Sequence, residues 1–286
     1  MLKCVNVGLK TILIMNYSKE FQTLLDCHTD GYIGHGNPNT KILFIGQEPA
    51  IDCKNNREQY VLEIADNAEQ WRNIVANGIG YDSIDPSKIE FGSPLHPWAN
   101  QKFQVRSVMN TGEIRGEEGT AKTWYNYQKL INRILELYSK DRKPMNKNDH
   151  IDFHRLSFHT DMSDAAYTKH SESIDDKQSV IERVSLLSAD FFRNFPIVIA
   201  AVGHFPRDTY GNSYFGDIFG VEFLGNEETE LYNWMNVSVR NDDAHPMLLI
   251  HTPQFSDAIS DRYIEQIAKR IVDFAKEHNI KLMPEE

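Results

Sequence analysis

Cysteine is scarce in this sequence, and the few cysteines are scattered. Only Cys4, Cys27 and Cys53 occur in 286 residues, and no two of them are spaced as a C-x-x-C pair. We therefore expect neither a disulfide framework nor a zinc or iron–sulfur site held by four thiolates. Reduced thiols are typical of the cytoplasm, and we expect a cytoplasmic protein.

Basic residues are also few. Lys and Arg total 30 against 41 Asp and Glu, which gives a formal net charge of −11. Nucleic-acid-binding surfaces gather Lys and Arg against phosphates, so general DNA binding is not expected and any basic rim must be local. One local basic stretch stands out, although a solvated loop is its alternative interpretation. It comprises Lys102, Arg106, Arg115 and Lys122.

Long apolar runs are missing as well. Residues 5–15 are apolar but are interrupted by Lys10, and no small-residue cleavage site follows them. They are too short to span a bilayer, so we expect neither a signal peptide nor a membrane partner. Met15 is an alternative start, and we predict that residues 1–14 are a leader or poorly ordered segment. Residues 15–286 are predicted to form a single domain.

Hydrophobic residues nevertheless make up 41% of the chain, which is enough for a sizeable core. Short apolar runs predict buried strands at 41–46, 196–203 and 246–251, with a more polar candidate at 151–158. Amphipathic periodicity predicts helices at 57–75, 123–138, 179–195 and 260–278, the last with Ser260 as its N-cap.

Strands that alternate with helices indicate right-handed crossovers. We therefore predict an α/β fold, a three-layer αβα sandwich with a short, mostly parallel four-stranded sheet. Two segments rich in Gly, Asn, Asp, Ser and Pro, 77–119 and 211–243, are predicted to be long loops or small subelements that hold part of the site.

Two strand ends hold the residues best suited to chemistry. The segment 46–50 (GQEPA) follows the first predicted strand, and 251–256 (HTPQFS) begins at the end of the last. Ligands of open α/β sheets bind beyond the carboxyl ends of the strands. We therefore expect the carboxylate of Glu48 and the imidazole of His251 to meet at one site.

These two motifs resemble those of the uracil-DNA glycosylase superfamily. In that family a Gly-Gln-Asp-Pro-Tyr or Gly-Glu-x-Pro-Gly turn follows the first strand, and a His-Pro-Ser-Pro-Leu-Ser turn follows the last. Glu48 stands where a catalytic Asp is common, and Phe255 stands at the position of the apolar wedge. The strand–helix order agrees from about residue 41 to 275. The direct matches are Gly46, Gln47, Pro49, His251 and Ser256.

The resemblance implies a DNA-repair type of hydrolase that cleaves an N-glycosidic bond of a nucleobase in DNA or a related compound, with no cofactor. Glu48 would orient the attacking water and offset the oxocarbenium charge. His251 would donate a hydrogen bond to the departing base, and Phe255 would insert into the base stack. The predicted substrate-binding residues are Gly46, Gln47, Pro49, Ala50, Phe153, Phe158, Phe255 and Ser256.

Two departures from the family pattern bear on activity. Ala50 stands where the family has Tyr or Gly, which would leave the site less selective against a 5-methyl group. The predicted strand 151–158 offers no Asn to read the base edge, and Phe91 is a second stacking candidate. An alternative function is therefore a catalytically silent glycosylase-fold protein that binds a small nucleotide-like ligand or a protein partner.

The three principal candidates also have structural alternatives. Glu48 suits the N-terminus of a helix, His251 suits a hydrogen bond to the backbone, and Phe255 suits the core.

Other chemistries find less support in the sequence. One group of possible ligands matches no known zinc spacing, so no metal site is predicted. The group is His150, Asp152, His154, His159 and Asp161. No G-x-S-x-G, P-loop or G-x-G-x-x-G pattern occurs, which argues against serine hydrolases, nucleoside triphosphates and NAD.

Overall fold

A computed structural model describes most of the chain from residue 17 to residue 283. The described residues are 17–49, 51, 57–84, 88, 92–97, 107–108, 114–115, 122–139, 151–164, 177–204, 214–227, 229, 233–256 and 259–283. The predicted leader lies outside them, as do several residues that the sequence singled out. These are Cys4, Met15, Ala50, Cys53, Phe91, Lys102, Arg106 and His150.

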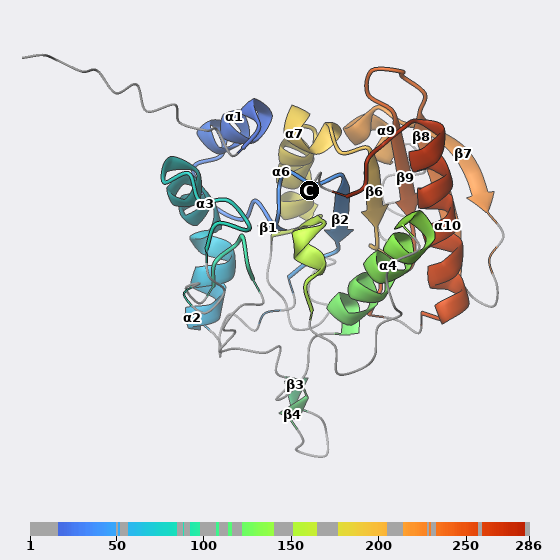
Figure 1. The fold of residues 1–286 in the computed structure, drawn as a ribbon. Coiled ribbons are helices and arrows are strands. Elements are labelled where there is room, and N and C mark those ends of the chain that lie inside the picture. Colours follow the sequence, from blue (N-terminus) through green and yellow to red (C-terminus); the bar gives the residue numbers. More distant parts are fainter. Residues whose placement is uncertain are drawn as a thin grey trace, which may run out of the picture.

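A seven-stranded mixed sheet forms the centre of the molecule, in the order β1-β5-β2-β6-β9-β8-β7 (Figure 1). Its four middle strands are parallel. They are β5 (Phe158–Asp161), β2 (Ile42–Gly46), β6 (Ile197–Ala200) and β9 (Met247–His251). Antiparallel strands flank them: β1 (His35–Gly36) on one side, and β8 (Met235–Arg240) and β7 (Glu222–Glu227) on the other.

The α/β class is therefore confirmed, but the prediction of a four-stranded sheet is wrong. The sheet is larger because β1 precedes the first predicted strand and because segment 211–243 contains β7 and β8 rather than loop alone. In β8, the buried apolar residues Met235, Val237 and Val239 alternate with Asn236 and Ser238. This period of two is typical of an antiparallel strand and contains no continuous apolar run. A separate pair of short strands, β3 (Ser107–Val108) and β4 (Ile114–Arg115), lies outside the main sheet.

The central strands are apolar because both of their faces are covered. In β2, Leu43 and Ile45 belong to one hydrophobic cluster and Ile42 and Phe44 to another. Helices α4 (Lys122–Ser139) and α10 (Asp261–Glu277) cover the second cluster, and we call this side the α4 face. The opposite side, which we call the α6 face, is covered by several helices. They are α1 (Lys19–Cys27), α3 (Asn67–Ala76), α6 (Lys177–Leu187), α7 (Asp190–Arg193) and α9 (Tyr214–Phe219).

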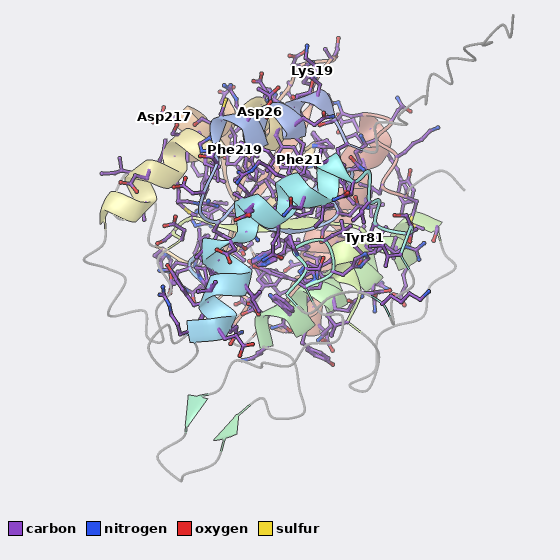
Figure 2. All side chains as sticks on the ribbon, turned by 90° about the vertical axis from the view of Figure 1, so that its left-hand side faces the viewer. Lys19, Phe21, Asp26, Tyr81, Asp217 and Phe219 are labelled. Carbon is purple, nitrogen blue, oxygen red and sulfur yellow. The ribbon has the colours of Figure 1, made fainter. Side chains whose placement is uncertain are left out.

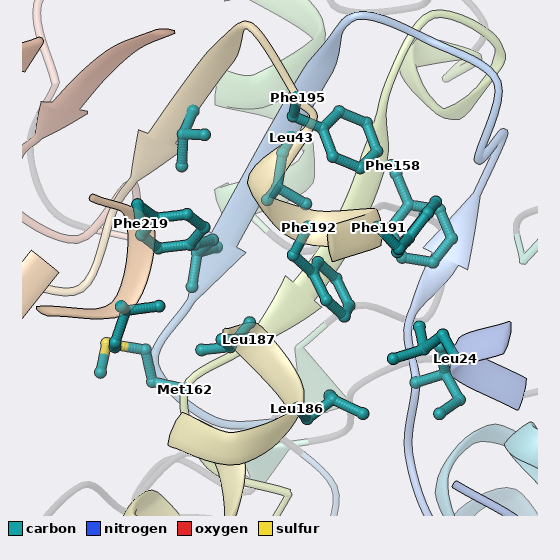
Figure 3. Close-up of a cluster of buried hydrophobic side chains, with 14 of the residues drawn as sticks. Leu24, Leu43, Phe158, Met162, Leu186, Leu187, Phe191, Phe192, Phe195 and Phe219 are labelled. Carbon is teal, nitrogen blue, oxygen red and sulfur yellow. The ribbon is translucent and has the colours of Figure 1, made fainter. Parts of the chain in front are cut away.

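Aromatic rings fill the core on the α6 face (Figure 3). The ring centroid of Phe158 lies 5.3 Å from that of Phe191, at an interplanar angle of 90°. A second neighbour, Phe195, lies 6.3 Å away. An edge-to-face pair such as Phe158–Phe191 stabilises a core beyond simple burial. Phe158, a predicted substrate-binding residue, is therefore a fully buried core residue in this structure.

The predicted helix 57–75 is interrupted. It consists of α2 (Arg57–Tyr60), a π-helical turn η1 (Val61–Ala65) and α3. Asn67 comes directly after this break, and its side chain holds the segment before β1. Its Oδ1 accepts hydrogen bonds from Ile33 N at 2.9 Å and Gly34 N at 3.2 Å. The indole of Trp71 donates to Gly34 O at 2.8 Å. Figure 2 shows α1 and α3 on the side of the molecule that faces the viewer.

The other predicted helices follow their patterns more closely. The predictions 123–138 and 260–278 correspond to α4 and α10, and Ser260 Oγ accepts the N-capping hydrogen bond from Tyr263 N at 3.1 Å. Segment 179–195 divides into α6 and α7. No helix in the described ranges is long and apolar enough to cross a membrane.

The predicted strand 151–158 is wrong. A 3₁₀ turn, η3 (Phe153–Arg155), occupies its middle, and β5 begins only at Phe158. The turn is fixed by the fully buried ring of Phe153, which packs edge-on against Phe44, and by Ser157 Oγ, which donates to Phe153 O at 2.8 Å.

Candidate functional site

The four parallel strands end at one edge of the sheet. Gly46 at the end of β2 pairs with Asp161 at the end of β5, and Ala200 of β6 pairs with His251 of β9. The two motifs from the sequence therefore lie at the same edge. The side chains also meet, because Gln254 Nε2 donates a hydrogen bond to Gln47 Oε1.

Backbone hydrogen bonds hold the loops at this edge together. Met162 N donates to Gly46 O at 3.0 Å, and Ser163 N donates to Gln47 O at 3.0 Å. These bonds extend the β2–β5 pairing past the strand ends, so the first turn of the GQEP motif is fixed against the segment after β5.

Gly46 is required by a side chain of the neighbouring strand. A β-carbon at Gly46 would clash with Asp161 Oδ1 and would lie 3.2 Å from His159 Nε2. The carboxyl group of Asp161 thus occupies the space that the glycine leaves, and it is almost fully buried. Our sequence interpretation considered Asp161 only as a metal ligand. Its place at the carboxyl end of a central strand was the missing signal, because the strand was predicted seven residues too early.

Asp161 lies among buried polar groups. Its carboxyl group is hydrogen-bonded to Tyr32, and Arg183 lies near it. Burial raises the pKa of Asp161 to about 7, and Arg183 and the hydrogen bond from Tyr32 oppose that rise. Arg183 is itself buried and donates from Nε to Asp161 O at 3.1 Å, from another nitrogen to Thr160 Oγ1 at 2.5 Å, and from a third to Tyr32 O.

Glu48 is electrostatically linked to the same carboxyl group. Its side chain is half-buried at the end of the β2 turn. Burial, and secondarily the charge of Asp161, raise the pKa of Glu48 to about 7. The two carboxyl groups therefore titrate in the same range, near neutral pH. The edge of the sheet therefore presents an acid and a base of similar strength.

His251 is also buried, but it lies on the other side of the sheet. Its strand neighbour Ala200 belongs to the α6-face cluster, whereas Phe44 and its strand partner His159 face α4. The Nε2–H of His251 donates to Gly203 O at 2.6 Å. Its ring lies between Phe215 of α9, with centroids 5.1 Å apart, and Trp234, with centroids 4.7 Å apart.

The remaining predicted residues divide between the core and the surface. Phe153 and Phe255 are fully buried on the α4 face, where Phe255 lies 5.2 Å from the ring of Tyr127. No wedge is therefore exposed at Phe255, and its core alternative describes this structure. Pro49 is buried, and the exposed Ser256 donates from Oγ to Gln254 Oε1 at 3.1 Å.

Metal binding has no support in the described ranges, which contain no group of three His, Cys, Asp or Glu side chains arranged to hold an ion.

No protein-family model and no curated protein sequence matches this chain. The chemistry of the site is therefore inferred from its geometry and from the motif resemblance.

Proposed function

We propose that this chain is a glycosylase-like hydrolase, built on a three-layer αβα arrangement, that cleaves the N-glycosidic bond of a nucleobase. The observation that supports this most directly is the convergence of the two motifs, joined by the hydrogen bond between Gln47 and Gln254. The coupling of Glu48 with Asp161 at the same edge adds the carboxylate chemistry that the reaction needs.

In the proposed reaction, ionised Glu48 orients a water molecule and accepts its proton as the oxygen bonds to the anomeric carbon. The glycosidic C–N bond breaks, and the departing base takes up the bonding electron pair and then the proton that Glu48 accepted from the water. Glu48 also offsets the positive charge that develops on the sugar. His251 would donate to the base only after releasing Gly203 O, because its Nε2–H is engaged there.

The proposed substrate is a nucleobase-containing small molecule rather than duplex DNA. The buried ring of Phe255 provides no wedge against a base stack, and a net charge of −11 opposes a phosphate backbone.

A second candidate is a non-catalytic protein that binds a nucleotide-like ligand. The hydrogen bond from His251 Nε2–H to Gly203 O favours this non-catalytic function, because it occupies the proton that His251 would donate to the base.

The first experiment is a cleavage assay on nucleosides and on single- and double-stranded oligonucleotides that contain normal, deaminated or damaged bases. We expect release of free base from at least one nucleoside, and a loss of roughly 100-fold or more in rate for Glu48→Gln. Glu69→Gln, an exposed carboxylate on α3, is the matched control.

The pH dependence provides a further check on the same assay. The rate should rise as pH increases through about 7, because the base form of Glu48 is the ionised one. If the wild-type protein releases no base from any substrate but still binds nucleotides, the second candidate replaces the first. Equal rates for Glu48→Gln and wild type would show that Glu48 is not the base.

A further inference from the structure

Buried polar atoms without hydrogen-bond partners gather on the α4 face. We define the histidine cluster as the rings of His35, His154 and His159 together with the hydroxyl of Tyr127. Within the described structure, His35 Nε2, His159 Nδ1, both ring nitrogens of His154 and the Tyr127 hydroxyl have no partner. A buried polar group left unpaired costs about 1–3 kcal/mol, so several together indicate a missing partner.

These groups are neighbours in space. His35 and His159 are directly paired across the β1–β5 ladder, which places their side chains on one face. The ring centroid of Tyr127 lies 5.8 Å from that of His159. His154 packs against β1, because a β-carbon placed at Gly36 would lie only 3.2 Å from its Cδ2. Residues from β1, β5, η3 and α4 thus converge.

Two of these rings each have a polar neighbour. His35 Nδ1 lies 3.1 Å from the Tyr32 hydroxyl, and His159 Nε2 lies 3.5 Å from Asp161 Oδ1. A neutral imidazole carries a single N–H, so a ring that directs its N–H at this neighbour presents its other nitrogen as an acceptor. In that tautomer the acceptors are His35 Nε2 and His159 Nδ1.

Both rings are also uncharged at neutral pH. Burial, with a smaller contribution from His159, lowers the pKa of His35 to about 3, and burial alone lowers the pKa of His159 to about 3. The cluster therefore offers lone pairs and a hydroxyl group, not positive charge. An anionic ligand does not suit it, and a ligand with N–H donors does.

We propose that the histidine cluster binds the base of the substrate, and that this base bears an amino group whose N–H bonds are accepted by His35 Nε2 and His159 Nδ1. The inference rests on the proposed function and names the class of base. An oxo base such as uracil has only single ring N–H groups next to carbonyl oxygens, so it would satisfy one acceptor and direct an oxygen at the other. Adenine and cytosine present an exocyclic amino group.

Aromatic rings border the cluster. Tyr127 stacks on Phe44 with ring centroids 4.2 Å apart and planes at 25°, which gives an aromatic wall beside the histidines. His35 and His159 keep 5% and 7% of their surface exposed, and their unpaired nitrogens are themselves buried. Asp161 lies beside His159 and influences the pKa of Glu48, so a base bound at the cluster would lie next to the two carboxyl groups.

Binding of free bases to the full chain, measured by isothermal titration calorimetry, tests this without requiring catalysis. We expect adenine or cytosine to bind about tenfold or more tightly than hypoxanthine or uracil. Tyr127→Phe removes only a hydroxyl group and keeps the ring packing, and it should weaken binding of the preferred base about fivefold. Tyr138→Phe on the same helix, whose hydroxyl contacts Ile280 O, is the matched control.

A second variant, His159→Gln, replaces the bare acceptor by an amide that both donates and accepts, and it should reduce the preference for amino bases. No binding of any free base, equal affinity for amino and oxo bases, or unchanged affinity in Tyr127→Phe would each overturn the inference. Binding of amino bases without cleavage of any substrate would leave the inference standing and refute the hydrolase. Cleavage with a preference for oxo bases would do the reverse.

Discussion

At the residue scale, the contact between Gly46 and Asp161 determines the shape of the site. The missing side chain at Gly46 leaves room for the carboxyl group of Asp161, which in turn interacts with Tyr32, His159 and Glu48. A glycine at this position of the GQEP motif therefore makes space for a functional group of the adjacent strand.

Gly46→Ala should displace the Asp161 side chain and lower the free energy of unfolding by about 1–3 kcal/mol, because the added carbon overpacks a buried site. Urea denaturation of a double-mutant cycle checks this. Gly46→Ala should cost clearly less in an Asp161→Ala background, where the clashing oxygen is gone. Additive losses across the cycle would show that the two residues do not compete for this space.

The sequence identified some of these residues and missed others for a physical reason. Gly46 and Glu48 follow a continuous apolar run, which is an unambiguous sign of a buried strand. Asp161 and His159 lie in β5, where His, Thr and Asp are buried among polar partners rather than in an apolar layer. His35 lies in a two-residue strand that is too short for any periodic pattern.

At the element scale, α6 fixes the end of β5 through Arg183. The guanidinium group is buried and binds the backbone oxygens of Tyr32 and Asp161 and the hydroxyl of Thr160. One side chain thus joins a helix to β5 and to the segment before β1.

Arg183→Met should lower the free energy of unfolding by about 3 kcal/mol or more, because it leaves buried acceptors without donors. Urea denaturation is the measurement. Arg133→Met is the control: Arg133 pairs with Glu136 and Glu265 at a partly exposed position, where such pairs contribute under about 1 kcal/mol. Similar losses for the two variants would contradict the role assigned to Arg183.

The elements that the sequence predicted well are those with a strong apolar signal. The strands β2, β6 and β9 are continuous apolar runs, and α4 and α10 have wide apolar stripes that pack against the sheet. The break near Asp66 was not predictable from periodicity, because it depends on the contact of Asn67 with Ile33 and Gly34. The strand β7 was missed because its residues are largely exposed and show no apolar face.

At the scale of the whole molecule, the site extends across the edge of the sheet. Asp161 lies on the α4 face and His251 on the α6 face, with the Gln47–Gln254 hydrogen bond between the motifs. A substrate that contacts both must therefore lie over the strand ends. The net charge of −11 describes the chain as a whole, whereas the proposed recognition of a base involves only the uncharged histidine cluster and two carboxyl groups.

Buried carboxyl groups and buried histidines make opposite contributions to the pH dependence of stability. The pKa of Asp161 is raised from 3.8 to about 7, so its contribution to stability is present at low pH and is lost as pH rises to about 7. The pKa values of His35 and His159 are lowered from 6.5 to about 3, so their contribution is present above pH 6.5 and is lost as pH falls towards 3.

Asp161→Asn separates the two contributions. The variant no longer ionises a buried carboxyl group, so its free energy of unfolding relative to wild type should increase between pH 4 and pH 8, by at most roughly 4 kcal/mol. Urea denaturation across this range measures the difference, and Asp26→Asn, at an exposed position of α1, controls for the loss of a carboxylate. A difference that stays constant with pH, or that decreases as pH rises, would mean that Asp161 is not held protonated by burial. An Asp161 that ionises well below pH 7 would also place a negative charge near Glu48 over the whole of this range, and that charge raises the pKa of Glu48.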